Sequence, residues 1–188
     1  MLELGAYWAH YSMWLKSRIP GARVTMAEPD PDNAAVGRAN LTKNGIEGTY
    51  IEDFVGDGRF ELDAWFEQGE RDRLDVLHCD IQGFETEMLS GARAVLEARR
   101  VDYWFISTHS QKIHREIERC MREAGYRIEV FADFDQQTTS HDGFILAMHP
   151  KRPAVIPGPA PLGRSEIAQA RPQALVESIL PRLARPGK

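Results

Sequence analysis

Hydrophobic residues in the first 149 positions form short apolar runs that alternate with longer stretches, in which apolar residues recur every three or four positions. Short runs indicate buried strands, and the wider spacing indicates amphipathic helices. The runs predict strands at residues 1–4, 24–27, 49–54, 74–79 and 101–107. The wider spacing predicts helices at residues 8–16, 62–68, 85–99 and 112–123. This alternation predicts an α/β domain built on a mostly parallel sheet with helices on its faces.

One further helix and a strand pair complete the predicted domain. The helix opens at Pro29-Asp30-Pro31-Asp32, with Asp30 or Asp32 as its N-cap, and it closes at Asn44-Gly45. Residues 126–131 and 144–148 are expected to form a closing antiparallel pair.

The chain length allows one domain and a tail. The protein has 188 residues, and 43% hydrophobic with 27% charged residues excludes a wholly disordered chain. Eight of the eleven prolines lie between Pro150 and Pro186. We therefore expect a domain at 1–149 and a tail at 150–188. A short helix within 168–183 would be limited by Pro172 and Pro181.

The net charge of −5 is unevenly distributed. The tail holds seven Lys and Arg against two Asp and Glu, which leaves 16 against 26 in the domain. An acidic domain is a poor partner for phosphate backbones, so nucleic acid is not expected as a partner. Cys79 and Cys120 have no metal-ligand spacing, and no apolar run approaches the roughly 20 residues that cross a bilayer. We expect a cytoplasmic protein without a membrane partner.

The turn after the first strand is a candidate cofactor site. Glu3, Gly5, Ala6 and Tyr7 lie where the chain passes from the strand to the first helix. A glycine lets a ligand approach the backbone, and a helix N-terminus offers N–H groups to an anion. An ordinary strand-to-helix turn explains the same residues.

Glu28 strengthens the cofactor interpretation. It ends the second strand, near the spacing at which a carboxylate accepts the ribose hydroxyls of a nucleoside cofactor. The absence of a GxGxxG motif argues against a dinucleotide and favours S-adenosylmethionine. The alternative is that Glu28 is a capping carboxylate beside Pro29. Asp57, in Gly56-Asp57-Gly58, is a candidate for contact with the adenine or a plain turn residue.

The end of the fourth strand carries the most specific motif, Asp80-Ile81-Gln82-Gly83-Phe84-Glu85, followed by Leu89-Ser90-Gly91-Ala92. These segments resemble the FkbM-type family of S-adenosylmethionine-dependent methyltransferases. Further similarity lies in Glu3-Leu4-Gly5-Ala6, Glu28-Pro29-Asp30 and Asp142-Gly143, so it spans residues 1 to about 149. Gln82 stands where the family more often has Glu, and Ala9 where it more often has Gly.

The resemblance implies a class I methyltransferase fold with a seven-stranded Rossmann-like sheet. It also implies methyl transfer from S-adenosylmethionine, usually to a hydroxyl of a small molecule or glycan. Two other classes stay open. One is a degenerate methyltransferase fold that acts as a binding or interaction module without turnover. The other is a nicotinamide or nucleotide-sugar enzyme, which the lack of a multi-glycine phosphate loop disfavours.

His109 and Asp80 are the candidate catalytic residues. Methyl transfer to oxygen needs a base near the strand ends, and His109 follows the fifth strand. Asp80 would orient His109 or hold a substrate hydroxyl. A solvated loop histidine is the alternative. Asp80, Glu85 and His109 together are a possible but not favoured divalent-metal site, because Glu85 more simply caps the next helix.

Four aromatic residues cluster near the first helix, and the domain begins with its first strand. Tyr11 and Trp14 are expected to pack in the core, whereas Tyr7 and Trp8 could flank the cofactor. Enzymes of this fold normally have helices that cover the site before the first strand. We expect that cover to come from a longer protein, from a neighbouring subunit of a homo-oligomer or from the basic tail.

Overall fold

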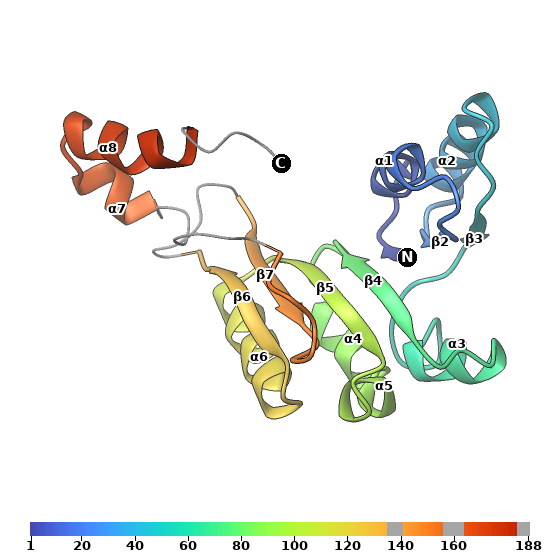
Figure 1. The fold of residues 1–188 in the computed structure, drawn as a ribbon. Coiled ribbons are helices and arrows are strands. Elements are labelled where there is room, and N and C mark those ends of the chain that lie inside the picture. The colour runs from blue at the N-terminus through green and yellow to red at the C-terminus, as the bar shows by residue number, and fades with distance from the viewer. Residues whose placement is uncertain (135–140, 156–163, 184–188) are drawn as a thin grey trace.

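The computed structural model describes residues 1–134, 141–155 and 164–183 of the chain. Within them the strands form one seven-stranded sheet in the order β3-β2-β1-β4-β5-β7-β6 (Figure 1). The strands are β1 Leu2–Leu4, β2 Thr25–Ala27, β3 Thr49–Ile51, β4 Leu74–Cys79, β5 Val101–Thr108, β6 Arg127–Ala132 and β7 Gly143–Met148. The first five run parallel, and β7 is antiparallel to both β5 and β6. The mostly parallel sheet and the closing antiparallel pair are confirmed.

Helices cover both faces of the sheet, as expected. The domain helices are α1 His10–Arg18, α2 Pro31–Lys43, α3 Leu62–Gln68, α4 Glu85–Ser90, α5 Arg93–Glu97 and α6 Gln111–Glu123. The larger hydrophobic cluster contains residues of helices α3, α4, α5 and α6, which pack on strand residues such as Leu4, Leu77 and Trp104. A smaller cluster joins α1 and α2 to the opposite face around Met26 and Leu41. The larger core therefore takes most of the buried strand residues, and Met26 of β2 belongs to the smaller one.

The expected single helix at 85–99 is wrong, because two helices, α4 and α5, occupy this segment. The carboxylate of Asp63 in α3 accepts the N–H groups of Ala94 and Val95 at 3.0 and 2.9 Å. That carboxylate caps a new helix start, while the carbonyl of Gly91 accepts the N–H of Asp63 at 2.9 Å. The break thus comes from α3, which sequence periodicity does not reveal.

Other element boundaries differ by a few residues. The first helix begins at His10 rather than at residue 8, because Ala9 has a left-handed backbone with φ 64°. The third strand ends at Ile51, and at residue 54 the side chain of Asp53 accepts the backbone N–H of Phe54.

The described part of the tail, residues 150–155 and 164–183, contains two helices instead of one. They are α7 Arg164–Gln169 and α8 Pro172–Leu183, and the helical conformation is interrupted just before Pro172. Proline suits the first position of a helix because its missing N–H would have no helical partner there. Across the described residues, no helix has both the length and the apolar character needed to cross a membrane.

Candidate functional site

Loops from four strands meet at one edge of the sheet. β1 and β4 are neighbours, yet the chain leaves them toward opposite sides of the strand order, which makes their carboxyl ends the topological switch point. Glu28 follows β2, Asp80 follows β4 and His109 follows β5. Asp142 precedes the antiparallel β7 and so reaches the same edge. The predicted site residues at these strand ends therefore lie along one edge.

Gly5 is required by the close approach of β4. Its backbone is left-handed with φ 74°, and a Cβ at this position would lie 1.8 Å from the carbonyl oxygen of Asp80. The N–H groups of Gly5 and Ala6 both donate to the carbonyl of Ala27 at 3.0 Å. The loop after β1 is thus packed against the ends of both neighbouring strands.

Glu3 binds the start of α1. Its side chain is 1% exposed, and its carboxylate accepts the N–H of Ser12 at 2.9 Å, the N–H of Tyr11 at 3.3 Å and the Ser12 hydroxyl. Burial raises the pKa of Glu3, and the bonds from Ser12 oppose that change. The helix N–H groups that we expected to be free for an anion are in part already taken by Glu3.

Glu28 faces the loop after β1. Its carboxylate accepts the N–H of Tyr7 at 2.7 Å and the N–H of Asp30 at 3.1 Å, and the residue is 6% exposed. A carboxylate has about four acceptor positions, so these two bonds leave capacity for hydroxyl donors. The bond to Asp30 is the local contact that a capping role predicts, and the bond to Tyr7 joins Glu28 to the candidate cofactor loop.

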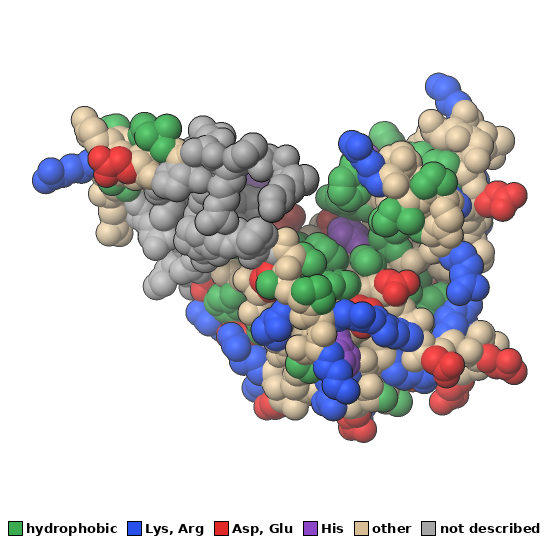
Figure 2. All heavy atoms as spheres, viewed as in Figure 1, with side chains coloured by type: hydrophobic (Ala, Val, Ile, Leu, Met, Phe, Trp, Pro, Cys, Tyr) green, Lys and Arg blue, Asp and Glu red, His purple; other side chains and the backbone are tan. Residues whose placement is uncertain are grey.

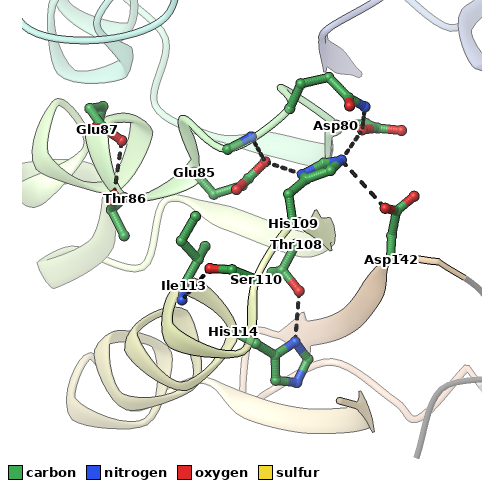
Figure 3. A network of polar contacts seen from close by, with 12 residues as sticks. Asp80, Glu85, Thr86, Glu87, Thr108, His109, Ser110, Ile113, His114 and Asp142 are labelled. Carbon is green, nitrogen blue, oxygen red and sulfur yellow. Dashed lines mark hydrogen bonds and ion pairs between the residues drawn. The ribbon is translucent and has the colours of Figure 1, made fainter. Parts of the chain in front are cut away.

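His109 lies among three carboxylates (Figure 3). Its Nδ1 is 2.7 Å from Glu85 Oε1, and its Nε2 is 3.2 Å from Asp80 Oδ1 and 3.7 Å from Asp142 Oδ1. The imidazole is 14% exposed and Glu85 is fully buried. Ser110 fixes the next turn, since its hydroxyl accepts the N–H of Ile113 and caps α6. The structure brings the two predicted catalytic residues, His109 and Asp80, into contact.

Sequence reasoning missed the roles of Glu85 and Asp142 at His109. Glu85 was grouped with Asp80 and His109 only as a possible metal ligand, and Asp142 was noticed only as part of a motif. The expected cap by Glu85 is not seen, because its Oε1 accepts the N–H of Gly83 instead of one within α4. Gln82 donates from its amide to Asp80 at 3.0 Å. The commoner Glu, as a carboxylate, has no such donor.

The aromatic residues near α1 are exposed. Tyr7, Trp8, Tyr11 and Trp14 are 45 to 59% exposed, and Figure 2 shows hydrophobic side chains on the surface over α1. The expected core packing of Tyr11 and Trp14 is wrong, because α1 buries Ser12 and leaves these two positions facing outward. Tyr7 and Trp8 stack on each other at 4.6 Å, and Tyr11 contacts the ring of His78 at 4.2 Å.

The structure adds no observation in favour of an adenine contact at Asp57 or of a metal at the possible ligands. Asp57 is exposed in the turn between β3 and α3. Across residues 1–134, 141–155 and 164–183, no group of three or more His, Cys, Asp or Glu side chains is arranged to hold a metal ion. The alternative of a metal at Asp80, Glu85 and His109 therefore has no geometric support.

A second buried histidine, His114, lies beneath this cluster. Its Nδ1 is 2.7 Å from the hydroxyl of Thr108, the residue before His109, and its ring contacts Phe131 at 4.5 Å. His114 is fully buried, and burial lowers its pKa to about 4. Gly143 makes room for this pair, because a Cβ there would lie 2.5 Å from Thr108 Oγ1 and 2.7 Å from His114 Nδ1.

The strand order and the site at the switch point define the class I fold of S-adenosylmethionine-dependent methyltransferases. The structure is similar to precorrin-6y C5,15-methyltransferase from Geobacter metallireducens, with a TM-score of 0.56, 17% identity and coverage of 79% of each chain. It is also similar to TrmK from M. capricolum in complex with S-adenosylhomocysteine, with a TM-score of 0.56 and 13% identity over 82% of this chain and 64% of that one.

The predicted resemblance to the FkbM-type family is confirmed. The family model for the methyltransferase FkbM domain matches residues 59–128. The FkbM methyltransferase from Methylobacillus flagellatus has a TM-score of 0.60 and 20% identity, over 79% of this chain and 43% of that chain. This chain thus spans less than half the length of that methyltransferase. No curated protein matches the chain.

Proposed function

We propose that this chain transfers a methyl group from S-adenosylmethionine to a hydroxyl oxygen of a small molecule or glycan, with His109 as the general base. The observation that carries the proposal is the position of His109 Nε2. It lies at the switch-point edge, 3.2 Å from Asp80 Oδ1, beside the loop that Gly5 packs against the end of β4. A base at this edge suits abstraction of a hydroxyl proton.

The residues at this edge fit S-adenosylmethionine. Glu28 retains acceptor capacity for a sugar diol beyond its bonds to Tyr7 and Asp30. The loop of Gly5, Ala6 and Tyr7 would border the cofactor, and Asp57 is the proposed adenine contact. Glu3 would act indirectly, because its carboxylate is bonded to Ser12 and Tyr11 and so fixes the loop.

When bound, S-adenosylmethionine would supply an electrophilic methyl group to the acceptor oxygen, and the bond between the methyl carbon and sulfur would break to leave S-adenosylhomocysteine. His109 Nε2 takes the hydroxyl proton as that oxygen forms its new bond to carbon. Asp80, which accepts a bond from Gln82 and lies 3.2 Å from His109 Nε2, would hold the acceptor hydroxyl in position. Aligned reactants and a positioned base account for the catalytic effect of such a site without covalent attachment to the protein.

Isothermal titration calorimetry with S-adenosylhomocysteine tests the cofactor assignment. Glu28→Ala should weaken binding by about 1 to 3 kcal/mol, the range for a charge-assisted hydrogen-bonding group. Glu52→Ala is the matched control, because Glu52 is an exposed carboxylate that pairs with Arg38 at the end of β3. Equal affinities of the two variants would contradict the role of Glu28.

Mass spectrometry of hydroxylated acceptors tests the reaction. The wild-type chain should add a methyl group in the presence of S-adenosylmethionine, and His109→Asn should lower that activity about 10²- to 10⁴-fold while it still binds S-adenosylhomocysteine. If the folded wild-type chain binds no S-adenosylhomocysteine, the alternative of an interaction module without turnover is favoured. The 6% exposure of Glu28 is the observation consistent with that alternative.

A further inference from the structure

Glu85 is a fully buried carboxylate that the proposed mechanism does not yet use. It lies at the first position of α4, and its Oε1 accepts the N–H of Gly83 at 3.1 Å and contacts His109 Nδ1 at 2.7 Å. Its Oε2 is buried without a hydrogen-bond partner among the described residues. Burying a carboxylate costs free energy that one weak turn contact does not offset, so its placement calls for a role.

The contact between Glu85 and His109 fixes the proton on the imidazole. A carboxylate can only accept, so a contact of 2.7 Å requires His109 Nδ1 to carry the hydrogen. The neutral ring then has its lone pair on Nε2. This atom is buried and has no hydrogen-bond partner among the described residues, although Asp80 Oδ1 lies 3.2 Å and Asp142 Oδ1 3.7 Å away (Figure 3). The nitrogen that must act as the base is thus the one left unprotonated.

The same contact fixes the direction of the ring. His109 has 14% exposure, and its backbone lies between the end of β5 and the Ser110 cap of α6. Rotation of the ring by half a turn about its Cβ–Cγ bond would put Cδ2 in the place of Nδ1 and would break the contact with the Glu85 carboxylate. Loss of this hydrogen bond would leave the buried carboxylate without its histidine partner, which disfavours the rotation.

We propose that Glu85 is the positioning residue of this site, which holds His109 in the Nδ1–H tautomer with Nε2 directed at the acceptor hydroxyl. The assignment rests on the proposed function, because it gives His109 the role of base. During the reaction the acceptor O–H proton moves to Nε2, and the resulting imidazolium is stabilised by Glu85, which stays ionised. Glu85 itself touches neither substrate nor cofactor.

Glu85→Gln is the direct test, with Glu87→Gln as the matched control. Glu87 lies two residues along α4, is exposed and contacts only Thr86 through its side chain among the described contacts. Glu85→Gln should lower kcat about 10- to 100-fold, as loss of an orienting partner does, with KM and S-adenosylhomocysteine affinity changed less than about twofold. Glu87→Gln should leave all three unchanged.

A double-variant cycle separates positioning from a merely structural role. If Glu85 acts through His109, Glu85→Gln should cause no further loss of kcat in a His109→Asn background. Additive losses would overturn the proposal. Circular dichroism and thermal unfolding of each variant check that the fold is retained.

Two-dimensional ¹H–¹⁵N NMR of the histidine rings gives a readout that needs no acceptor. Over a pH series, the neutral His109 ring of the wild-type chain should carry its proton on Nδ1, with its signals assigned by their loss in His109→Asn. Glu85→Gln should produce a mixture of tautomers, and Glu87→Gln should not. A wild-type ring protonated on Nε2, or unchanged signals in Glu85→Gln, would overturn the proposal.

The two readouts distinguish the two proposals. If the chain binds no S-adenosylhomocysteine but the tautomer of His109 depends on Glu85, the proposed function fails and the orientation of the ring by Glu85 stands. If the chain transfers methyl groups but Glu85→Gln behaves like Glu87→Gln, the function stands and the positioning role fails.

Discussion

Lowering the pH from 7 to 4 should destabilise the fold through His114. The folded chain holds His114 neutral at 0% exposure, with a pKa lowered by burial from 6.5 to about 4. The unfolded chain therefore binds a proton at this residue between about pH 6.5 and pH 4 that the folded chain does not bind. Stability rises with pH wherever the unfolded state binds more protons, so it must fall as the pH decreases through this window.

The size of the effect follows from the two pKa values. They differ by about 2.5 pH units, which at 1.36 kcal/mol per unit corresponds to a loss of about 3 kcal/mol by pH 4. The neighbouring charges do not cancel this loss, because burial dominates over Asp133, Arg115 and Glu118. Asp133 is itself paired with Arg115 at 2.9 Å.

Urea denaturation at a series of pH values measures the effect. His114→Asn removes the titrating ring and keeps a polar group beside Thr108. The free energy of unfolding of this variant should be lower than that of the wild type at pH 7. Between pH 7 and pH 4 it should fall by about 3 kcal/mol less than that of the wild type. His141→Asn, at an exposed position, should run parallel to the wild type. Parallel curves for wild type and His114→Asn would refute the reasoning. Thr108, the partner of His114, directly precedes His109, so S-adenosylhomocysteine binding and methyl transfer should be measured over the same series of pH values.

Three further substitutions test the loops around the site. Ala9→Gly should change the free energy of unfolding by less than about 1 kcal/mol, because relief of the alanine backbone at φ 64° is offset by the freedom of glycine in the unfolded chain and by loss of a fully buried methyl group; a change of more than about 2 kcal/mol in either direction would contradict this. Gly5→Ala should destabilise by more than about 2 kcal/mol, because the Cβ meets the Asp80 carbonyl, whereas Gly45→Ala, with φ 64° and nothing within 4 Å, should lose only about 1 kcal/mol; equal losses would show that the contact is unimportant. Asp63→Ala should cost about 1 to 2 kcal/mol by urea denaturation through loss of the α5 cap, and no measurable loss would argue against that capping role.

The sequence predicted the sheet and the meeting of the strand ends well. Strand positions followed from apolar runs, and Asp80 and His109 could be placed together because carboxyl ends of neighbouring parallel strands share an edge. The helix from Pro31 was also predictable, since Asp30 is its N-cap and accepts two backbone N–H groups.

The contacts that involve side chains from distant elements were not predictable. Nothing in the spacing of residues 85 and 109 indicates that Glu85 turns toward His109 rather than toward its own helix. The break at Gly91 depends on Asp63, which is remote in sequence. Periodicity describes one element at a time, so contacts between elements require the three-dimensional packing.

The loop after β1 is anchored at both ends, and this restricts its length. One end is held by the bonds of Gly5 and Ala6 to Ala27, and the other by the bonds of Glu3 to the first turn of α1. One residue inserted in the first turn of α1, before Ser12, would rotate the rest of the helix by about 100° and turn Ser12 away from Glu3. Insertions should instead be tolerated at Gly45, where added atoms meet open space. Libraries that aim to diversify this protein by changing loop length should therefore begin at the end of α2.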